Sequence, residues 1–350
     1  MTLIKLPTLS VVIPVRNEQD YLRGCLDSVL IALDRVPPAE VLIVEGRSTD
    51  ETRDIALQYG ARHPRVRILD NPARVTPAAF NVGIRAARAP YIAIVSGHSE
   101  LTEDFFRAAL SRLEACDADI VGGPIDTRPG RPSRLAWLLA QIVSHPFGVG
   151  NSRFRVSRRP AHVDAVPFAV FRRKVFETVG LFDERLPRNQ DTEFFGRVAR
   201  AGIRVFLDPD VKSSYYARGT LTGFLTQGFR NAFWNVRVWR WNHHAFQWRH
   251  GIPGLFATVF WSLAFLSAVS PIAAAAIATL MVIYGASAIV ASLHVALGTR
   301  RPLALLLPPL FLLYHLTYGT GSLLGLRWVM QPGSPGPPPR LSAPSADLHE

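Results

Sequence analysis

The sequence has little cysteine, almost no lysine and a long stretch without acidic residues. Only Cys25 and Cys116 occur in 350 residues, which excludes a disulfide scaffold and a zinc site built from paired CxxC motifs. Just three of the 39 basic residues are lysine, and the formal net charge is +12. No Asp or Glu lies between Asp210 and Asp347. The excess of arginine indicates an acidic partner, which can be a nucleic acid, an anionic membrane face or a phosphorylated substrate.

Two long uncharged tracts lie inside the stretch without acids. They run from Gly251 to Thr299 and from Pro302 to Leu326. A membrane span needs about 20 apolar residues, so the first tract can hold two helices and the second can hold one. The sequence therefore predicts a multi-pass integral membrane protein with three transmembrane helices.

Arginines flank these predicted spans, three before the first and two between the second and third: Arg237, Arg240, Arg249, Arg300 and Arg301. Positive charges gather on the cytoplasmic side, so the N-terminal part is predicted to lie in the cytoplasm at the plasma membrane and the C-terminal tail outside. The predicted organisation is a catalytic domain, interfacial amphipathic helices, a transmembrane region and a disordered Pro-rich tail: 1–215, 216–250, 251–328 and 329–350.

The N-terminal part alternates predicted strands with segments of helical spacing. Apolar runs mark four strands: Leu9–Val15, Val41–Glu45, Val66–Leu69 and Tyr91–Ser96. This alternation predicts a doubly wound α/β sheet, which binds ligands at the carboxyl ends of its strands. Pro-Val-Arg-Asn-Glu stands at the end of the first strand, where a dinucleotide site needs GxGxxG. Nicotinamide and flavin chemistry is therefore disfavoured.

The N-terminal part resembles the start of the family 2 glycosyltransferases in three segments: VVIPVRNEQDYLRGCLDSVL, VLIVEGRSTDET and NVGIRAARAPYIAIVSGHS. Later segments resemble the succinoglycan-biosynthesis type of membrane glycosyltransferase: HPFGVGNSRFR, VDAVPFAVFRRKVFETVGLFDERLPRNQDTEF and HLTYGTG. The resemblance implies a GT-A-like nucleotide-diphospho-sugar transferase domain. It also implies inverting transfer of a sugar, with a UDP-sugar as the expected donor, to a polyprenyl-diphosphate-linked glycan. That reaction serves exopolysaccharide or cell-surface glycan synthesis.

The resemblance also implies which residues bind the donor. The turn after the first strand and the loops after the second and fourth strands would surround the nucleotide and its ribose: Pro14, Arg16, Asn17, Glu18, Glu45, Asp50, Ser96 and Gly97. Glu45 stands where these enzymes usually carry Asp, which lengthens its reach by one methylene. Asp50 is equally well explained as the N-terminal cap of the helix that follows it.

Asp191 matches the catalytic carboxylate of the family, in the segment Arg188-Asn189-Gln190-Asp191. As general base it would take the proton of the acceptor hydroxyl, with Gln190 beside it near the diphosphate. The helical spacing that follows places Asp191 at a helix N-terminus, which predicts a lowered pKa. The alternative is a carboxylate that only caps the helix.

The metal motif departs from the family pattern. The resemblance leads us to expect Asp-x-Asp or Asp-x-His after the fourth strand, but Ser96-Gly97-His98 stands there. His98 can bind Mn²⁺ as a neutral imidazole, whereas Mg²⁺ prefers oxygen ligands, and Glu100 could complete the shell. We therefore expect a Mn²⁺ or Mg²⁺ cofactor with His98 as its ligand. The alternative is a structural His98, with arginines alone supplying the countercharge.

Other arginines are expected at the diphosphate or at the acceptor. Gln227 and Arg230 match the Gln-x-x-Arg part of a Gln-x-x-Arg-Trp element, although Asn231 replaces the Trp. Arg153 and Arg155 lie in a Gly-containing segment that could equally be an ordinary surface loop. The segment from Phe224 to Trp248 interleaves arginine with tryptophan, a pattern that favours lipid headgroups over nucleic acid next to apolar helices.

Two further functions stay open at this stage. One is transfer of a sugar to polyprenyl phosphate itself, a close variant of the same chemistry. The other is a non-catalytic membrane scaffold for polysaccharide assembly, which the missing acidic metal motif favours and which the presence of Asp191 disfavours.

Overall fold

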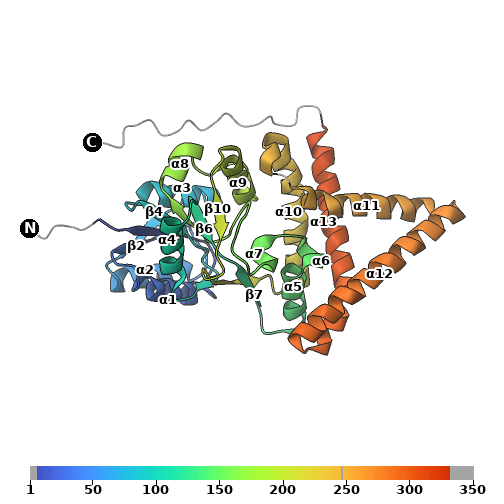
Figure 1. Cartoon of the computed structure of the whole chain (residues 1–350), viewed down its shortest axis with the longest axis horizontal. Helices are drawn as coiled ribbons and strands as arrows, with labels where there is room; N and C mark the ends of the chain where they lie inside the picture. Colours follow the sequence, from blue (N-terminus) through green and yellow to red (C-terminus); the bar gives the residue numbers. More distant parts are fainter. Residues whose placement is uncertain (1–5, 246, 332–350) are drawn as a thin grey trace, which may run out of the picture. The chain divides into compact units, whose positions relative to one another are not determined.

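The computed structural model describes residues 6–245 and 247–331, and these form two compact units (Figure 1). The α/β unit contains residues 6–126 and 157–215, and the helical unit contains residues 127–156 and 216–331. Residues 127–156, which precede the predicted boundary at residue 215, thus group with the helical unit. The predicted tail lies outside the described residues from residue 332 onward.

The α/β unit is built on an eight-stranded sheet with the order β3-β2-β1-β4-β9-β6-β10-β8. The first four strands are neighbours and parallel: β1 (Leu9–Val15), β2 (Ala39–Glu45), β3 (Val66–Asp70) and β4 (Tyr91–Ile94). The remaining strands are β9 (Val170–Arg172), β6 (Ile120–Gly122), β10 (Val205–Leu207) and β8 (Ala161–His162). The predicted α/β sheet is confirmed, but it is mixed, because β9 runs antiparallel to both β4 and β6.

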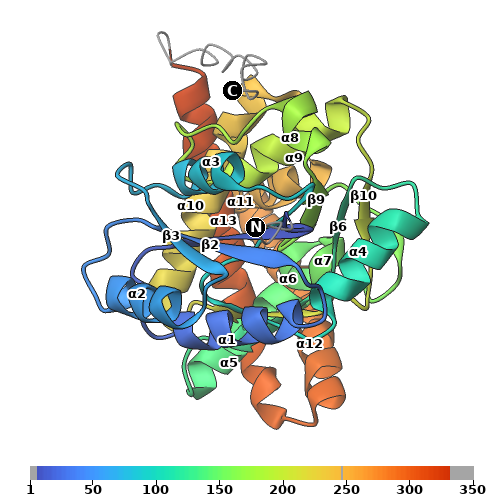
Figure 2. The same ribbon diagram turned by 90° about the vertical axis from the view of Figure 1, so that its left-hand side faces the viewer.

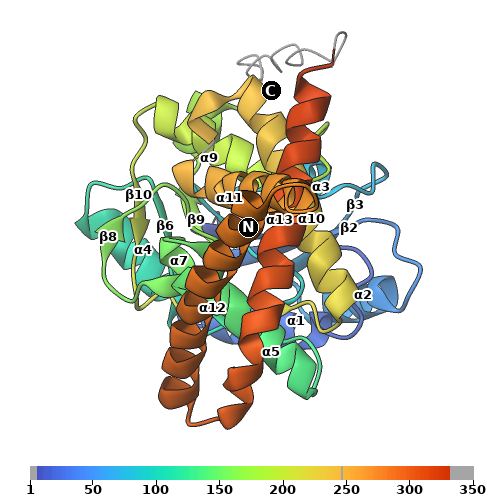
Figure 3. The same ribbon diagram turned by 90° about the vertical axis from the view of Figure 1, so that its right-hand side faces the viewer.

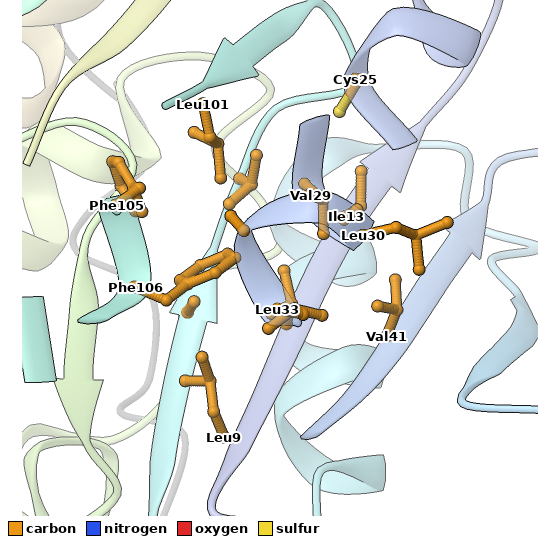
Figure 4. Close-up of a cluster of buried hydrophobic side chains, with 14 of the residues drawn as sticks. Leu9, Ile13, Cys25, Val29, Leu30, Leu33, Val41, Leu101, Phe105 and Phe106 are labelled. Atoms are coloured by element: carbon orange, nitrogen blue, oxygen red, sulfur yellow. The ribbon is translucent and has the colours of Figure 1, made fainter. Parts of the chain in front are cut away.

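Helices cover both faces of this sheet (Figure 2). They are α1 (Leu22–Leu33), α2 (Thr52–Arg62), α3 (Thr76–Ala86), α4 (Phe105–Ala115), α8 (Lys174–Val179) and α9 (Gln190–Arg200). Apolar residues of α1 and α4 pack on β1 and β2 in one buried cluster, with Phe106 and Leu33 at its centre (Figure 4). On the opposite face α3 lies so close to β1 that a Cβ at Gly83 would be 2.2 Å from Val12 Cγ1. This tight packing fixes the strand ends that carry the candidate site.

Three short strands lie near the points where the chain passes between the units: β5 (Ser99–Leu101), β7 (Ile125–Pro129) and β11 (Ser213–Ala217). Strand β5 pairs antiparallel with β11, so that Ser99 faces Tyr215. This pairing belongs to a separate three-stranded sheet with the order β5-β11-β7, and it holds the segment after β4 against β11.

The helical unit consists of α5 (Arg134–Ser144), α6 (Pro146–Val149), α7 (Arg153–Val156), α10 (Leu221–Trp241), α11 (Trp248–Leu266), α12 (Pro271–Thr299) and α13 (Leu307–Val329). Two short 3₁₀ turns join them, His243–Ala245 and Pro302–Leu306. Helices α10 and α13 lie side by side, whereas α11 runs across α13 and is seen nearly end-on in Figure 3.

Two helices, not three, are long and apolar enough to cross a membrane among the described residues. They are Pro271–Thr299 and Pro302–Val329, which contain 18-residue windows with mean hydropathies of 2.1 and 1.3. The first predicted span corresponds to α11, which does not meet this criterion and whose first residues include Arg249 and His250. The apolar remainder, residues 252–266, extends about 22 Å at 1.5 Å per residue, which is shorter than a hydrocarbon core of about 30 Å.

Glycines bring α13 into close contact with two neighbouring helices. A Cβ at Gly321 would lie 2.5 Å from the carbonyl oxygen of Phe229 in α10. A Cβ at Gly319 would lie 2.1 Å from the carbonyl oxygen of Pro253 in α11. Small residues allow this close backbone approach, as in helix pairs inside membranes.

We expect the Gly319→Ala substitution to destabilise the helical unit. The added methyl group would meet backbone rather than a side chain that can rotate away, and such overpacking costs about 1–3 kcal/mol. Gly285→Ala in α12 is the matched control, because no atom lies within 4 Å of its Cβ position. Thermal unfolding in detergent should show a lower Tm for Gly319→Ala only. Equal Tm values for both variants would contradict the close contact.

Candidate active site

Three loops meet at one edge of the sheet. Strand β1 lies between β2 and β4 and is parallel to both, so the carboxyl ends of the three strands are adjacent. The segments that follow them are 16–18, 46–50 and 96–98, which contain most of the predicted donor-binding residues. The structure therefore brings these residues together, as the strand pattern predicts.

Hydrogen bonds lock the loops after β1 and β2 to each other. The Asn17 N–H donates to Ser48 Oγ at 3.1 Å, and the Thr49 N–H donates to Asn17 Oδ1 at 2.9 Å. The Glu18 N–H donates to Thr52 Oγ1 at 2.7 Å. Sequence reasoning missed Ser48, Thr49 and Thr52, because their role depends on a loop 30 residues away in the chain.

Two residues of these loops have left-handed backbone conformations. Asn17 has a φ of 55° and Arg47 a φ of 53°. This conformation is unfavourable for a side chain as large as arginine, and such strain gathers at functional sites. Arg16, Asn17 and Arg47 are exposed residues beside the strand ends. Arg16 donates to the Arg74 carbonyl oxygen at 3.1 Å, and Arg47 donates to Asp70 Oδ2 at 3.4 Å. Guanidinium groups are suited to binding diphosphate oxygens.

The two acids of the loop after β2 are engaged within the protein. Glu45 is buried, and its carboxylate accepts from the Ser48 N–H at 2.6 Å and from Arg53 Nη1 at 2.8 Å. Burial acts to raise the pKa of Glu45, but these hydrogen bonds hold it below the ordinary value. Asp50 accepts hydrogen bonds from the Thr52 and Gln19 N–H groups. Burial acts to raise the pKa of Asp50, but its hydrogen bonds have the larger combined effect and lower it. Both acids are therefore ionised and brace the loop.

His98 lies against the turn after β1. Its Nδ1 is 2.9 Å from Glu18 Oε1, and Ser96 Oγ lies 3.1 Å from the same nitrogen. The Tyr215 ring packs edge-on against the imidazole, with 5.2 Å between ring centroids. Gly97 leaves little room, since a Cβ there would lie 3.0 Å from Val15 Cγ1. These contacts place an imidazole and a carboxylate next to the exposed loop edge.

The chemistry of this pair fits a divalent cation held mostly by other ligands. No group of three or more His, Cys, Asp or Glu side chains that could hold a metal ion occurs in the described part of the chain. Glu18 and His98 nevertheless offer a carboxylate oxygen and an imidazole nitrogen side by side. Two protein ligands suit an ion such as Mn²⁺ whose other ligands come from a bound diphosphate and water.

Asp191 lies in the first turn of α9. Its Oδ1 accepts the Thr192 N–H at 2.8 Å, and the side chain is in contact with solvent. Desolvation by the surrounding protein raises the pKa of the carboxyl, and the hydrogen bond from Thr192 opposes this only in part. The prediction of a lowered pKa is therefore wrong in direction, because desolvation outweighs the helix terminus. A raised pKa makes Asp191 a stronger base.

The other acid in this turn is committed to holding the helix. Glu193 forms a bidentate ion pair with Arg197, whose Nε donates to Oε1 and whose Nη2 donates to Oε2, both at 2.9 Å. Arg197 also donates to the carbonyl oxygens of Val179 and Leu181, which tie α9 to the segment after α8. Asp191, by contrast, is exposed and accepts the N–H of the next residue, Thr192.

Asn81, on α3, fixes the chain that leads to α9. This fully buried side chain donates from Nδ2 to Phe182 O at 2.8 Å and to Glu184 Oε1 at 2.8 Å. It also accepts the Phe182 N–H at 2.9 Å, and the Phe182 ring then stacks on Phe194 of α9. Sequence reasoning missed Asn81, because nothing in its helix indicates a partner 100 residues away.

We expect Asn81→Ala to lower both stability and activity. The change leaves the Phe182 N–H without its buried acceptor, which costs about 1–3 kcal/mol and frees the segment that positions Asp191. Gln58→Ala is a suitable control, since it removes an exposed hydrogen bond to Arg23. Thermal unfolding and transfer rate are the measurements. A normal Tm together with a normal rate would show that Asn81 does not position α9.

The remaining predicted residues belong to the helical unit. Arg155 donates to Thr127 Oγ1 at 3.3 Å, and Arg153 is exposed in α7. Gln227 and Arg230 lie one helical turn apart on α10, and Arg230 is exposed. Its position is opposite to that of Gly228, which contacts α13, so the guanidinium points away from the helix pair.

Trp234 packs against Arg237, which lies three residues further along α10. The guanidinium of Arg237 lies 4.1 Å from the Trp234 ring and 3.6 Å from the Trp328 ring. Such stacking of a cation between two indoles stabilises the contact of α10 with α13. Trp234 is therefore a packing residue in this structure.

The sequence profile described as Glycosyl transferase family 2 matches residues 10–180, which contain the three loops. Residues 10–180 form a family 2 glycosyltransferase domain. The chain is 29% identical over 221 residues to "Succinoglycan biosynthesis protein ExoA" of Rhizobium meliloti, a match that covers 63% of this chain and 66% of that protein, just under two thirds.

Two further similarities extend over most of this glycosyltransferase. A protein of Methanococcus voltae is 25% identical over 326 residues, which cover 91% of this chain and 97% of that one. Its name is dolichyl N-acetyl-alpha-D-glucosaminyl phosphate 3-beta-D-2,3-diacetamido-2,3-dideoxy-beta-D-glucuronosyltransferase. A mannosyltransferase from Pyrobaculum calidifontis, solved with GDP-Man and Mn²⁺, covers 91% of this chain with a TM-score of 0.61 at 20% identity. This structural likeness confirms the GT-A-like fold.

Proposed function

We propose that this glycosyltransferase transfers a sugar from a nucleotide diphospho-sugar to a lipid-linked glycan. The transfer inverts the configuration at the anomeric carbon. The observation that carries the proposal is the convergence of three loops at the carboxyl ends of β1, β2 and β4, inside a family 2 domain. Their exposed groups suit a nucleotide diphosphate, with Asn17 for hydroxyl or base atoms and Arg16 and Arg47 for phosphate oxygens.

Asp191 is the proposed general base. In an inverting displacement the acceptor hydroxyl attacks the anomeric carbon while its proton passes to a carboxylate, and the nucleoside diphosphate leaves with the bonding electrons. Glu193, Glu45 and Asp50 are each engaged in hydrogen bonds within the protein. We therefore assign the role of general base to Asp191. Gln190 precedes it on the first turn and is proposed to bind the diphosphate or the acceptor.

A divalent cation is proposed to assist departure of the nucleoside diphosphate. Glu18 and His98 would hold it, and when bound it neutralises charge that builds up on the leaving phosphates. Ser96, Gly97 and Pro14 shape the same edge, where Ser96 Oγ can bind a ribose hydroxyl. The structure of the Pyrobaculum mannosyltransferase is of a complex with GDP-Man and Mn²⁺, which supports this proposal.

The acceptor is proposed to be a polyprenyl-diphosphate-linked glycan at the cytoplasmic face of the plasma membrane. Arg153, Arg155, Gln227 and Arg230 supply the groups for its diphosphate, and the apolar helix Pro271–Thr299 supplies a membrane anchor. The names of the relatives from Rhizobium and Methanococcus, which refer to succinoglycan and to a dolichyl-linked sugar, support a role in exopolysaccharide or cell-surface glycan synthesis.

The test is sugar transfer by the full chain in membranes. Membranes are incubated with radiolabelled UDP-sugars and GDP-sugars, each with a polyprenyl-diphosphate glycan or with polyprenyl phosphate as acceptor. We expect label in the lipid fraction with a UDP-sugar and the diphosphate-linked glycan. Label on polyprenyl phosphate alone would favour the simpler acceptor. No transfer from any donor, with donor binding intact, would favour the scaffold function.

A further inference from the structure

The chain itself fixes the side of the membrane on which two helices of the helical unit begin. A linker of four residues joins β7 to α5, and a linker of three residues joins β11 to α10. An extended chain covers about 3.5 Å per residue, so each linker spans less than about 20 Å. A hydrocarbon core is about 30 Å thick. The starts of α5 and α10 therefore lie on the same side of the membrane as the α/β unit, called here the catalytic side.

The turn between α12 and α13 also lies on the catalytic side. The Arg301 guanidinium stacks on the Trp137 ring of α5, with 5.4 Å to the ring centroid. Leu139 of α5 shares one buried cluster with Val295 of α12 and Leu307 of α13. The chain therefore returns to the catalytic side after α12.

Helix α13 then packs along one face against a charged helix. Gly321 and Gly325 contact the α10 backbone at Phe229 and Phe233, and Trp328 stacks on Arg237. Helix α10 also carries Arg230 and Arg240. If α13 crossed the membrane, this neighbour would cross with it, at a cost of about 2.5–3.5 kcal/mol for each arginine at mid-depth. The contacts therefore indicate that neither helix crosses.

The start of α11 supports the same conclusion. The Arg249 guanidinium donates to Asn151 Oδ1 at 3.4 Å, in the segment between α6 and α7. From there α11 crosses the middle of α13, where Gly319 meets Pro253 and the Trp261 indole N–H donates to Thr320 Oγ1 at 3.3 Å. A membrane-spanning α13 would place Arg249 and His250 near the bilayer centre.

Beyond these contacts the ends of α11 and α12 form an apolar lobe, residues 262–283. It contains no charged residue, and Phe265, Val269 and Ile272 are 80%, 82% and 83% exposed. The lobe joins the rest of the helical unit at Tyr284. The Tyr284 ring stacks on Phe256, and its hydroxyl lies 2.8 Å from His315 Nδ1. From Tyr284 to the tip, α12 extends about 20 Å at 1.5 Å per residue. That length enters a hydrocarbon core of about 30 Å without crossing it.

We propose that the lobe of residues 262–283 inserts into the bilayer from the catalytic side and ends within it. Helices α10 and α13 lie on the catalytic side, and the chain as far as Gln331 does not cross the membrane. The occupant of the exposed apolar surface is lipid hydrocarbon. This arrangement replaces the predicted three spans, and it rests on the proposed membrane location but not on the proposed chemistry.

The test is labelling of single introduced cysteines with a membrane-impermeant maleimide. Val269→Cys reports on the tip, Met330→Cys on the end of α13, and Leu57→Cys on α2 gives a reference for the catalytic side, all three being exposed positions. The unsubstituted chain, with buried Cys25 and half-buried Cys116, gives the background. Right-side-out and inverted membrane vesicles are compared, and labelling is repeated in detergent.

We expect Met330→Cys to be labelled in the same vesicles as Leu57→Cys, and Val269→Cys to be labelled only in detergent. Labelling of Val269→Cys or Met330→Cys solely in the opposite vesicles would show a crossing and overturn the proposal. Labelling of Val269→Cys together with Leu57→Cys would place the lobe in water and overturn it too. Recovery of the chain in the soluble fraction would instead refute the membrane location itself.

Discussion

Replacing Asp191 by asparagine should reduce sugar transfer by a factor of about 10²–10⁴ while leaving donor affinity nearly unchanged. The amide keeps the size of the carboxylate and can still accept the Thr192 N–H that Asp191 accepts at 2.8 Å. It cannot take a proton, and a general base contributes a rate factor of this size. The measurements are kcat with saturating donor and the donor Kd from titration.

Asp54→Asn is the matched control, because Asp54 is an exposed acid in the first turn of α2. It should transfer sugar at the normal rate. The pH profile gives a second check, since the active base is the ionised form and desolvation raises the pKa of Asp191. The rate should fall as the pH drops through a value above about 3.9, the ordinary pKa of aspartate. Near-normal turnover of Asp191→Asn would remove this residue from the mechanism.

The candidate donor edge could be predicted because it follows from local patterns. Continuous apolar runs indicate buried parallel strands, and parallel neighbours place their carboxyl ends together. The predicted strand Leu9–Val15 coincides with β1, and Glu18 and His98 meet as their positions suggest. By contrast, the antiparallel insertion of β9 depends on pairing with β4 and β6, which no local pattern specifies.

The helical unit shows the limit of hydropathy as a guide. Hydropathy treats each helix alone, and on that basis α13 qualifies as a span. Its glycines, however, fit the backbone of α10 and α11, and Trp328 packs on Arg237. The pKa of Asp191 was mispredicted for a related reason, since the helix terminus can be inferred from sequence but the packing that desolvates the carboxyl cannot.

Removal of divalent cations should reduce transfer by a factor of about 10² or more. Metal countercharge on a leaving diphosphate is worth several kcal/mol, and each 1.36 kcal/mol is tenfold in rate. Glu18 and His98 form a pair of candidate ligands at the donor edge. Two protein ligands bind an ion weakly when no donor is present, because the diphosphate of the donor supplies further ligands. Addition of the nucleotide-sugar donor should therefore strengthen Mn²⁺ binding, which electron paramagnetic resonance measures.

His98→Ala should abolish this donor-dependent Mn²⁺ binding and should lower transfer to the rate seen in chelator. His63→Ala is the control, because that imidazole stacks on Tyr59 at the far end of α2. Mn²⁺ should restore activity better than Mg²⁺, since an imidazole nitrogen suits Mn²⁺ whereas Mg²⁺ prefers oxygen ligands. Full activity in excess chelator would mean that exposed arginines such as Arg16 and Arg47 neutralise the diphosphate alone. The Glu18–His98 pair would then serve to hold the turn after β1 against the segment after β4.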